Sequence, residues 1–256
     1  LKKVAENITA TSFQTTGLSN NTKYYWQVVA KNKIDENKIG ETKGEVYSFI
    51  TPLDIPQNVT ASSNEIYPDN NNVEIRWNAI TDVNVKGYNV YVKAHGEGNG
   101  IKHNREQLVT ATSYALSNMD YSLNGHVVYV TAVYEIEGGT YESNMSATQT
   151  IKVTGYGKIN GTITDANSNG IDGVNITVTG TDEFGKAANY TATTDENGAY
   201  SIENVLVGTY SLTASRLDYK TYTNPSVGVT YNLVTAGSFS LESNPSAPFT
   251  VNAGEG

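Results

Sequence analysis

The stretch "VVYVTAVY" (Val127–Tyr134) is rich in β-branched and aromatic residues and has a side-chain pattern that repeats every two residues. A period of two residues is that of a β-strand, whose successive side chains point to opposite faces of a sheet. The same period recurs in "YYWQVVA" (Tyr24–Ala30), "VEIRW" (Val73–Trp77) and "YNVYV" (Tyr88–Val92), and turn clusters such as "PDNNN" at 68–72 separate these runs. Short strands with frequent turns predict an all-β fold made of tandem immunoglobulin-like β-sandwiches.

The composition agrees with this fold class and excludes several functions. Asn, Thr, Tyr, Val and Gly are abundant, which favours strands and turns. The absence of Cys excludes a disulfide framework and a thiol nucleophile. A net charge of −9, with scattered Lys and Arg, disfavours nucleic acid as a partner. No apolar run approaches the roughly 20 residues of a membrane helix, so no membrane insertion is expected.

Joints rich in Pro or Gly divide the chain into blocks. The joints are "ITPLDIP" at 50–56, "KVTGYG" at 152–157 and "ESNPSAP" at 242–248. Blocks 56–153 and 156–243 each have the size of one β-sandwich, whereas block 1–51 is too short to bury a core of its own. Residues 244–256 are interpreted as a linker or the start of a further domain. Because the sequence has no initial Met or signal peptide, we expect it to be cut from a longer protein.

Residues 56–153 resemble a fibronectin type III domain. The features that carry the resemblance are the opening Pro56, the "VTAS" strand, Trp77 on the next strand, the Y-x-V-Y run and the alternating "VYVTAVY" run. The resemblance implies that Trp77 is a core residue.

Residues 1–51 resemble the second half of the same fold. Leu18, Thr22 and Tyr24 fit the family's L-x-x-x-T-x-Y run around the tyrosine corner, in which a Tyr hydroxyl bonds a nearby backbone group. The resemblance implies structural roles for Leu18, Tyr24 and Trp26. In the next block the position that aligns with the corner Tyr is His126, a departure from the family pattern.

Residues 156–243 resemble the carboxypeptidase regulatory-like module, which has a prealbumin-like sandwich and is related to carbohydrate-binding-like folds. The matching motifs are G-x-I at 161–163, D-x-x-x-x-G-I-D-G-V at 165–174, T-D-E-N-G-x-Y at 194–200 and V-x-x-G-x-Y at 205–210. The resemblance implies structural roles for Gly198, Tyr200, Gly208 and Tyr210, and it implies no catalysis because the zinc ligands of carboxypeptidases belong to another domain.

The stretch "DANSNG" raises the question of a calcium site. Asp165, Asn167 and Asn169 fit positions 1, 3 and 5 of an EF-hand loop, but position 12 is Ile176 where a bidentate Glu belongs. Both flanks are strand-like, and "DENG" at 195–198 also links two strands. A hairpin turn is therefore favoured over a weak calcium site, and no metal or other cofactor is predicted.

Few other residues indicate chemistry. His95 with Glu97 and His103 with Glu106 could in principle bind a metal, but they lack a metalloprotease spacing and fit a solvated loop better. No Ser lies in a G-x-S-x-G elbow. The chain is thus not predicted to be an enzyme, although its parent protein could be a secreted peptidase or glycoside hydrolase.

Two function hypotheses follow from the sequence. The first is a non-catalytic accessory region of a large secreted or cell-surface bacterial protein, serving as spacer and interaction modules for another extracellular protein. The alternative is a carbohydrate-binding or adhesive module in block 156–243, with Tyr219 and Tyr222 in an expected loop as the sugar-contacting pair.

Overall fold

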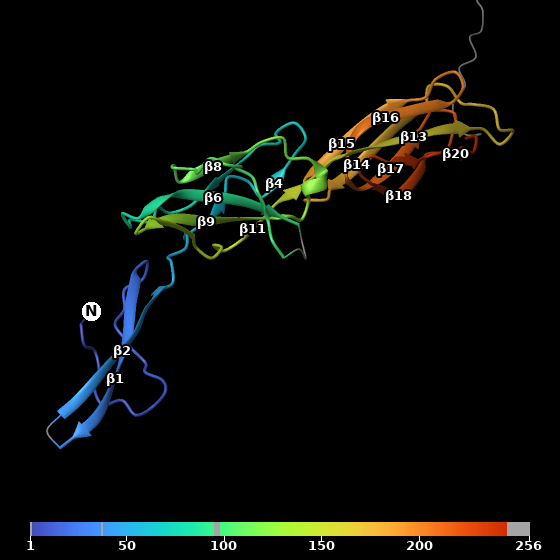
Figure 1. The fold of residues 1–256 in the computed structure, drawn as a ribbon. Coiled ribbons are helices and arrows are strands. Elements are labelled where there is room, and N and C mark those ends of the chain that lie inside the picture. The colour runs from blue at the N-terminus through green and yellow to red at the C-terminus, as the bar shows by residue number, and fades with distance from the viewer. Residues whose placement is uncertain (1, 37, 95–97, 245–256) are drawn as a thin grey trace, which may run out of the picture. The chain divides into compact units, whose positions relative to one another are not determined.

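The structure is a computed structural model that describes residues 2–36, 38–94 and 98–244. Almost all of its regular elements are strands, which confirms the all-β prediction (Figure 1). The described residues fall into two compact units. One comprises Leu1–Ser62, Val73–Leu116 and His126–Thr150, and the other comprises Ser63–Asn72, Ser117–Gly125 and the residues from Ile151 onward.

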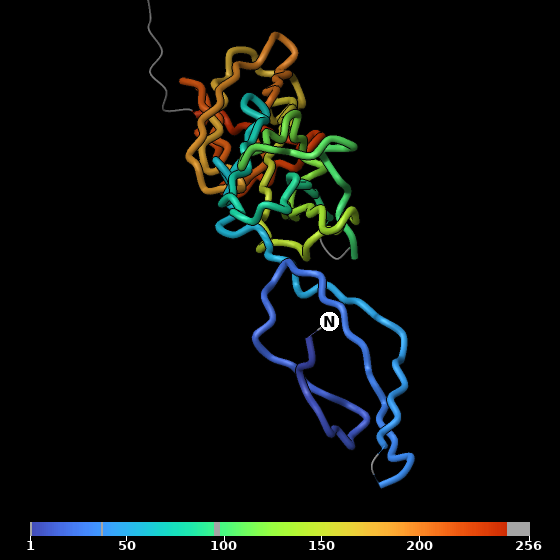
Figure 2. Tube along the Cα trace, turned by 60° about the vertical axis from the view of Figure 1, so that its left-hand side comes forward, coloured from blue at the N-terminus to red at the C-terminus, as the bar shows by residue number. Residues whose placement is uncertain are grey.

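The first unit begins with a long antiparallel hairpin, β1 (Lys23–Asp35) and β2 (Lys38–Ile50), whose strands run side by side in Figure 2. No other strand pairs with this two-stranded sheet among the described residues. Its apolar side chains are consequently exposed: Trp26 is 47% exposed and Val28 62%. Trp26 stacks on Tyr47 with ring centroids 5.1 Å apart. The Tyr24 hydroxyl accepts a hydrogen bond from the Ser19 backbone N–H at 3.0 Å, which is the bond expected of a corner Tyr.

The rest of the first unit is a sandwich, here called the first sandwich. One sheet has the order β3 (Thr60–Ala61), β5 (Val73–Arg76), β8 (Ser113–Leu116). The other has the order β10 (Gly139–Glu142), β9 (Val127–Ile136), β6 (Val85–Lys93), β7 (Ile101–Lys102), and β11 (Gln149–Thr150) also pairs with β9.

Alternation along these strands builds the core of the first sandwich. Val128, Val130 and Ala132 of β9 are fully buried on one face, and Tyr129, Thr131 and Val133 on the other face are also buried. Trp77 follows β5, is 4% exposed and meets Tyr88 edge to face with centroids 5.3 Å apart.

The second unit contains the second sandwich, residues 156–241. One sheet joins β16 (Ala199–Leu206), β13 (Tyr156–Thr164) and β19 (Val234–Ala236), with β20 (Phe239–Ser240) also pairing in parallel with β13. The other has the order β15 (Ala187–Thr193), β14 (Asn175–Asp182), β17 (Gly208–Ser215), β18 (Tyr222–Val229). Inward residues of both sheets form one core, including Ile159, Ile163, Ile176, Val178 and Leu212.

The second unit also takes in two segments that connect strands of the first sandwich. Segment 63–72 lies between β3 and β5 and carries β4 (Glu65–Ile66), which pairs in parallel with β12 (Lys152–Val153). Segment 117–125 lies between β8 and β9 and carries the short 3₁₀ helix η1 (Tyr121–Leu123). No helix among the described residues is long and apolar enough to cross a membrane.

Candidate functional site

The residues implied as structural by the family resemblance occupy distinct places in the second sandwich. Tyr200 and Tyr210 are buried, and each hydroxyl donates to a backbone carbonyl at 2.8 Å, of Gly237 and Leu206 respectively. Each phenol therefore fills the core while its polar atom keeps a partner.

Gly198 and Gly208 lie where backbone segments approach closely. A Cβ on Gly198 would lie 2.2 Å from the Ile163 carbonyl oxygen, and one on Gly208 would lie 2.4 Å from the Thr181 carbonyl oxygen. Only glycine fits at such distances without a shift of the backbone. Leu18, in the first unit, is half-buried.

The Asp165 loop is a turn closed by the antiparallel bridge between Thr164 and Gly170, and its carboxylate is already engaged. It is not the predicted hairpin, because the strands that it links, β13 and β14, belong to different sheets. Asp165 Oδ1 accepts hydrogen bonds from the backbone N–H groups of Asn167 and Asn169, both at 2.8 Å, and Oδ2 accepts from Asn169 Nδ2 at 3.0 Å. These Asn169 and Asn167 donors hold the pKa of the Asp165 carboxyl below its ordinary value. Asn167 and Asn169 thus donate to Asp165, which is the role of turn residues.

The same arrangement occurs at two other turns of the second sandwich. Asp182 Oδ1 accepts from the backbone N–H groups two and four residues later, at 2.9 Å each, and Asp195 Oδ1 does so at 2.9 and 2.8 Å. In each turn the fourth residue has positive φ: Ser168 (65°), Gly185 (87°) and Gly198 (73°). Three copies of one turn show that "DANSNG" and "DENG" share a structural cause. The described residues contain no group of three or more His, Asp or Glu that could hold a metal.

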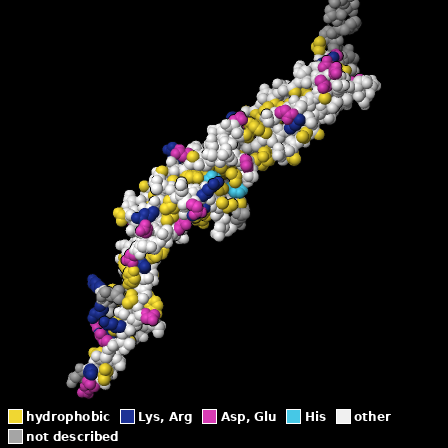
Figure 3. Space-filling model, turned by 45° about the horizontal axis from the view of Figure 1, so that its top comes forward, with side chains coloured by type: hydrophobic (Ala, Val, Ile, Leu, Met, Phe, Trp, Pro, Cys, Tyr) yellow, Lys and Arg dark blue, Asp and Glu magenta, His cyan; other side chains and the backbone are white. Residues whose placement is uncertain are grey.

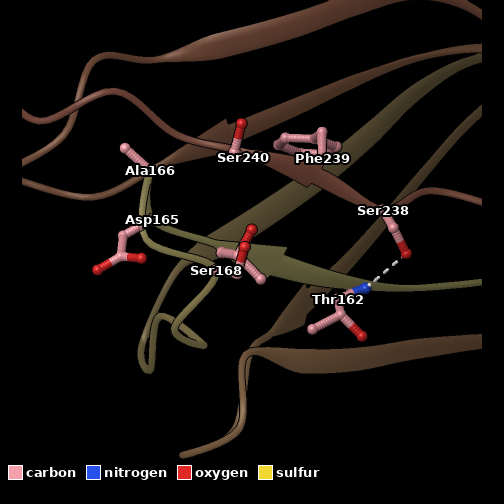
Figure 4. Close-up of a pocket in the computed structure, with 8 residues that line it drawn as sticks. Thr162, Asp165, Ala166, Ser168, Ser238, Phe239 and Ser240 are labelled. Atoms are coloured by element: carbon pink, nitrogen blue, oxygen red, sulfur yellow. Dashed lines mark hydrogen bonds between the residues drawn. The ribbon is translucent and has the colours of Figure 1, made fainter.

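A groove lies beside the Asp165 turn, with a volume of about 430 Å³ (Figure 4). Thr162, Thr164, Asp165, Ala166, Ser168, Ser238, Phe239 and Ser240 line it. Two elements build this lining, the end of β13 with its turn and the β20 segment, which Ser238 joins to β13 by accepting from the Thr162 N–H at 2.9 Å. Hydroxyl groups, one carboxylate and one aromatic ring suit the binding of a polar ligand.

The structure does not bring Tyr219 and Tyr222 together as an open platform. Tyr222 is not in a loop as predicted: it begins strand β18 and stacks on Phe239 with ring centroids 4.0 Å apart and an interplanar angle of 23°. Tyr219 packs against the core of the second sandwich, and the guanidinium of Arg216 lies 5.7 Å from its ring centroid. The sequence missed Phe239, because the aromatic partner of Tyr222 comes from a strand far along the chain.

The connection between residues 151 and 157 is held by contacts within the second unit. Thr154 N–H donates to the Ile66 carbonyl at 2.9 Å, and Val153 N–H donates to Asn124 Oδ1 at 3.0 Å. The Tyr156 hydroxyl donates to Asp69 Oδ1 at 3.0 Å. These contacts join segments 63–72 and 117–125 to the chain that leads into β13, and we call this region the junction.

Aromatic rings complete the junction. Tyr121 stacks on Tyr231 with ring centroids 4.4 Å apart. Gly155 lies against the Tyr231 ring, where a Cβ on residue 155 would be 2.3 Å from Tyr231 Cδ2. Tyr67 meets the ring of Phe184 edge to face at 5.7 Å, and Lys186 Nζ lies 4.7 Å from the Tyr67 ring centroid.

A buried carboxylate, Asp182, lies beside Tyr67 of the junction. Asp182 is 4% exposed, and its buried Oδ2 has no hydrogen-bond partner. The Tyr67 hydroxyl faces this carboxylate, and burial, followed by the interaction with Asp182, raises the pKa of Tyr67 to about 12. Burial likewise raises the pKa of the neighbouring Glu183 carboxyl.

A polar cluster lies on the β6, β9 and β10 strands of the first sandwich. Glu142 Oε1 accepts from Asn89 Nδ2 at 3.0 Å, from the Tyr91 hydroxyl at 2.8 Å and from the Thr131 hydroxyl. Asn89 and Thr131 are themselves buried. No pattern in the sequence predicts this cluster, since its members lie on three separate strands.

The histidine positions show no metal geometry in the described part of the chain. His103 lies in the turn after β7, as predicted, but it is partly buried, with its ring edge to face against Tyr114 at 5.9 Å. Burial, followed by the nearby Arg105 charge, lowers the pKa of His103. His95 and Glu97 lie outside the described residues. On the face drawn in Figure 3, acidic and basic side chains are interspersed.

Comparisons with solved structures find matches at low similarity. The TIE protein of Bacillus anthracis is 10% identical, with 73% of this chain and 40% of that chain covered and a TM-score of 0.35. BcpA, the major pilin subunit of Bacillus cereus, is 15% identical, with 82% and 80% covered and a TM-score of 0.32. Domains D2 and D3 of the major pilin SpaD of Corynebacterium diphtheriae are 8% identical, with 73% and 98% covered and a TM-score of 0.37.

The chain spans about 40% of the length of the TIE protein. No curated protein matches this sequence. The family model of the carboxypeptidase regulatory-like domain matches residues 158–242. Most of the second sandwich is therefore similar to a carboxypeptidase regulatory-like domain, as its motifs predicted.

Proposed function

We propose that this chain is a non-catalytic accessory region of a secreted or cell-surface protein, in which β-sandwich modules space and orient other parts and contact other extracellular proteins. In this proposal residues 1–51 are the second half of a fibronectin type III domain, residues 56–153 a complete one, residues 156–243 a regulatory-like sandwich, and residues 244–256 a linker or the start of a further domain. The three-stranded and five-stranded sheets of the first sandwich support the second of these assignments.

The observation that carries the spacer function is the junction. A free linker of Gly and polar residues would let successive domains reorient. Here "KVTGYG" is paired by backbone hydrogen bonds to segment 63–72 and is flanked by the Tyr121–Tyr231 stack. A connection held in this way transmits orientation, which a spacer requires.

Limited trypsin digestion of the full chain tests the spacer function. Lys152 lies in β12, whereas Lys3 lies in a segment without regular structure. We expect slow cleavage at Lys152 and fast cleavage at Lys3, with Lys152 becoming fast in the double variant Tyr67→Ala/Tyr121→Ala. The matched control is Tyr47→Ala, an exposed Tyr of the hairpin. Equal rates at Lys152 and Lys3 in the unmodified chain would contradict the proposal.

The second candidate function is polysaccharide binding by the second sandwich. The stack of Tyr222 on Phe239, beside a groove lined with hydroxyl groups, favours it. Tyr222 remains the sugar-contacting candidate, with Phe239 in place of Tyr219 as its partner. Affinity electrophoresis through gels that contain soluble polysaccharides tests this function, and the absence of retardation on every polymer would exclude it in favour of the spacer alone.

A further inference from the structure

The groove beside the Asp165 turn is lined mainly by residues with hydroxyl groups. Thr164 and Ser168 contribute hydroxyls from the β13 side, and Ser240 contributes one from β20. Figure 4 shows Ser168 and Ser240 on the two sides of the groove, with Asp165 on the turn at its end and its carboxylate directed away from Phe239. A hydroxyl both donates and accepts, so this lining matches a ligand whose own groups are hydroxyls.

The Asp165 carboxylate keeps capacity for a ligand. A carboxylate offers about four acceptor positions. Two positions on Oδ1 take backbone N–H groups, and one on Oδ2 takes Asn169 Nδ2. One acceptor position on Oδ2 is left, and the turn holds this oxygen in a fixed orientation.

The aromatic wall of the groove is supported from behind. Tyr222 covers one face of the Phe239 ring, and Phe239 packs partly on the core of the second sandwich. Tyr222 is itself 36% exposed. Phe239 lines the groove and Tyr222 does not, so Phe239, held in place by Tyr222, presents a rigid apolar surface to the apolar face of a sugar ring.

The charge around the groove disfavours an acidic ligand. No Lys or Arg lines it, and the Asp165 turn holds an ionised carboxylate at its end. The two basic residues that come just before Tyr222 in the chain form ion pairs. Lys220 pairs with Glu242 at 2.9 Å, and Arg216 pairs with Asp218 at 3.1 Å. An acidic sugar would therefore meet like charge without a counter-charge.

We propose that this groove is a subsite for one uncharged sugar residue of a polysaccharide, with the sugar ring against Phe239, which Tyr222 holds in place, and a sugar hydroxyl donating to Asp165. This proposal rests on the second candidate function. It adds the class of sugar, the position of the subsite and the reason for which acidic polymers are rejected.

Affinity electrophoresis of the full chain tests it with neutral gels of galactomannan, mixed-linkage β-glucan and starch, and with acidic gels of alginate and hyaluronan. The variants are Tyr222→Ala and Asp165→Asn, and Tyr47→Ala is the control because Tyr47 is also exposed and ring-stacked. Each variant's thermal midpoint is recorded, so that loss of folding is distinguished from loss of binding.

We expect retardation by at least one neutral polymer and none by the acidic polymers. Tyr222→Ala should weaken neutral binding about tenfold while Tyr47→Ala leaves it unchanged. Asp165→Asn should also weaken neutral binding, because it replaces a charged acceptor of the sugar hydroxyl with a neutral one. Neutral binding that survives Tyr222→Ala, or retardation of the unmodified chain by acidic polymers alone, overturns this inference and leaves polysaccharide binding standing. No retardation by any polymer overturns both.

Discussion

The rings of Tyr121 and Tyr231 lie face to face, with centroids 4.4 Å apart and an interplanar angle of 19°. Tyr121 belongs to the short 3₁₀ helix η1, and Tyr231 follows strand β18. Gly155 fits beside Tyr231 only because it has no side chain. This stack joins a segment between β8 and β9 to the second sandwich, and it is central to the spacer function proposed for the chain.

The two glycine turns predict different costs for the same substitution. Gly185 (φ +87°) has open space around a built Cβ, whereas Gly198 (φ +73°) would place its Cβ 2.2 Å from the Ile163 carbonyl oxygen. Ser168 occupies the equivalent position of the third turn, so the backbone conformation alone tolerates a side chain. Gly185→Ala should cost about 1 kcal/mol of unfolding free energy, and Gly198→Ala more than about 3 kcal/mol. Denaturant unfolding measures both, and equal costs would contradict the turn geometry.

Two substitutions of Trp77, to Ala and to Phe, should differ in their cost in unfolding free energy. The indole is buried against Tyr88, but its Nε1–H has no hydrogen-bond partner. Trp77→Ala should therefore cost about 3–5 kcal/mol, through the cavity it leaves. Trp77→Phe removes the unpaired donor along with some volume, and we expect a cost below about 2 kcal/mol. Calorimetry of both variants checks this, and a larger loss for Phe than for Ala would exclude the core assignment.

Glu142 predicts a dependence of stability on pH. Burial raises its pKa, but hydrogen bonds from Thr131, Asn89 and Tyr91 outweigh burial and hold the pKa below 4.5. Because the folded pKa is lowered, this carboxylate stabilises the fold above pH 4.5, and the stabilisation is lost as the pH falls through the lowered value. We expect Glu142→Gln to flatten the fall of the thermal midpoint between about pH 5 and about pH 3.

The control for this titration is Glu106→Gln, which changes an exposed carboxylate of the same unit. Its thermal midpoint should follow that of the unmodified chain over the whole pH range. An equal flattening by both substitutions would assign the acid sensitivity to general charge repulsion instead of the Glu142 cluster.

The β1–β2 hairpin predicts fast amide exchange. A two-stranded sheet is marginally stable in water, and Trp26, Val28 and Tyr47 are largely exposed. We expect the amides of Tyr24–Ala30 to exchange far faster than those of Val128–Tyr134 in the buried strand β9. Hydrogen exchange with mass spectrometry of the full chain measures this, and equal protection would show that something covers the hairpin.

The sequence predicted those features that depend on local patterns. The pattern at Val127–Tyr134 predicted strand β9, and "DENG" predicted the turn that Gly198 completes. Features that need two distant segments could not be predicted. Tyr222 begins a strand because it pairs with Ala214, and Phe239 covers its ring only through the pairing of β20 with β13. The contact between Tyr67 and the Asp182 turn likewise has no local signature.

The most direct test of the spacer function is the distance distribution between two spin labels in the second unit. The absence of Cys in the chain allows labels at Asn72→Cys and Thr191→Cys without other changes, and Thr191→Cys with Thr209→Cys serves as a control pair within the second sandwich. A junction that holds orientation predicts a distribution as narrow as that of the control, broadened by Tyr67→Ala/Tyr121→Ala. A broad distribution in the unmodified chain, beside a narrow control, would contradict the spacer function.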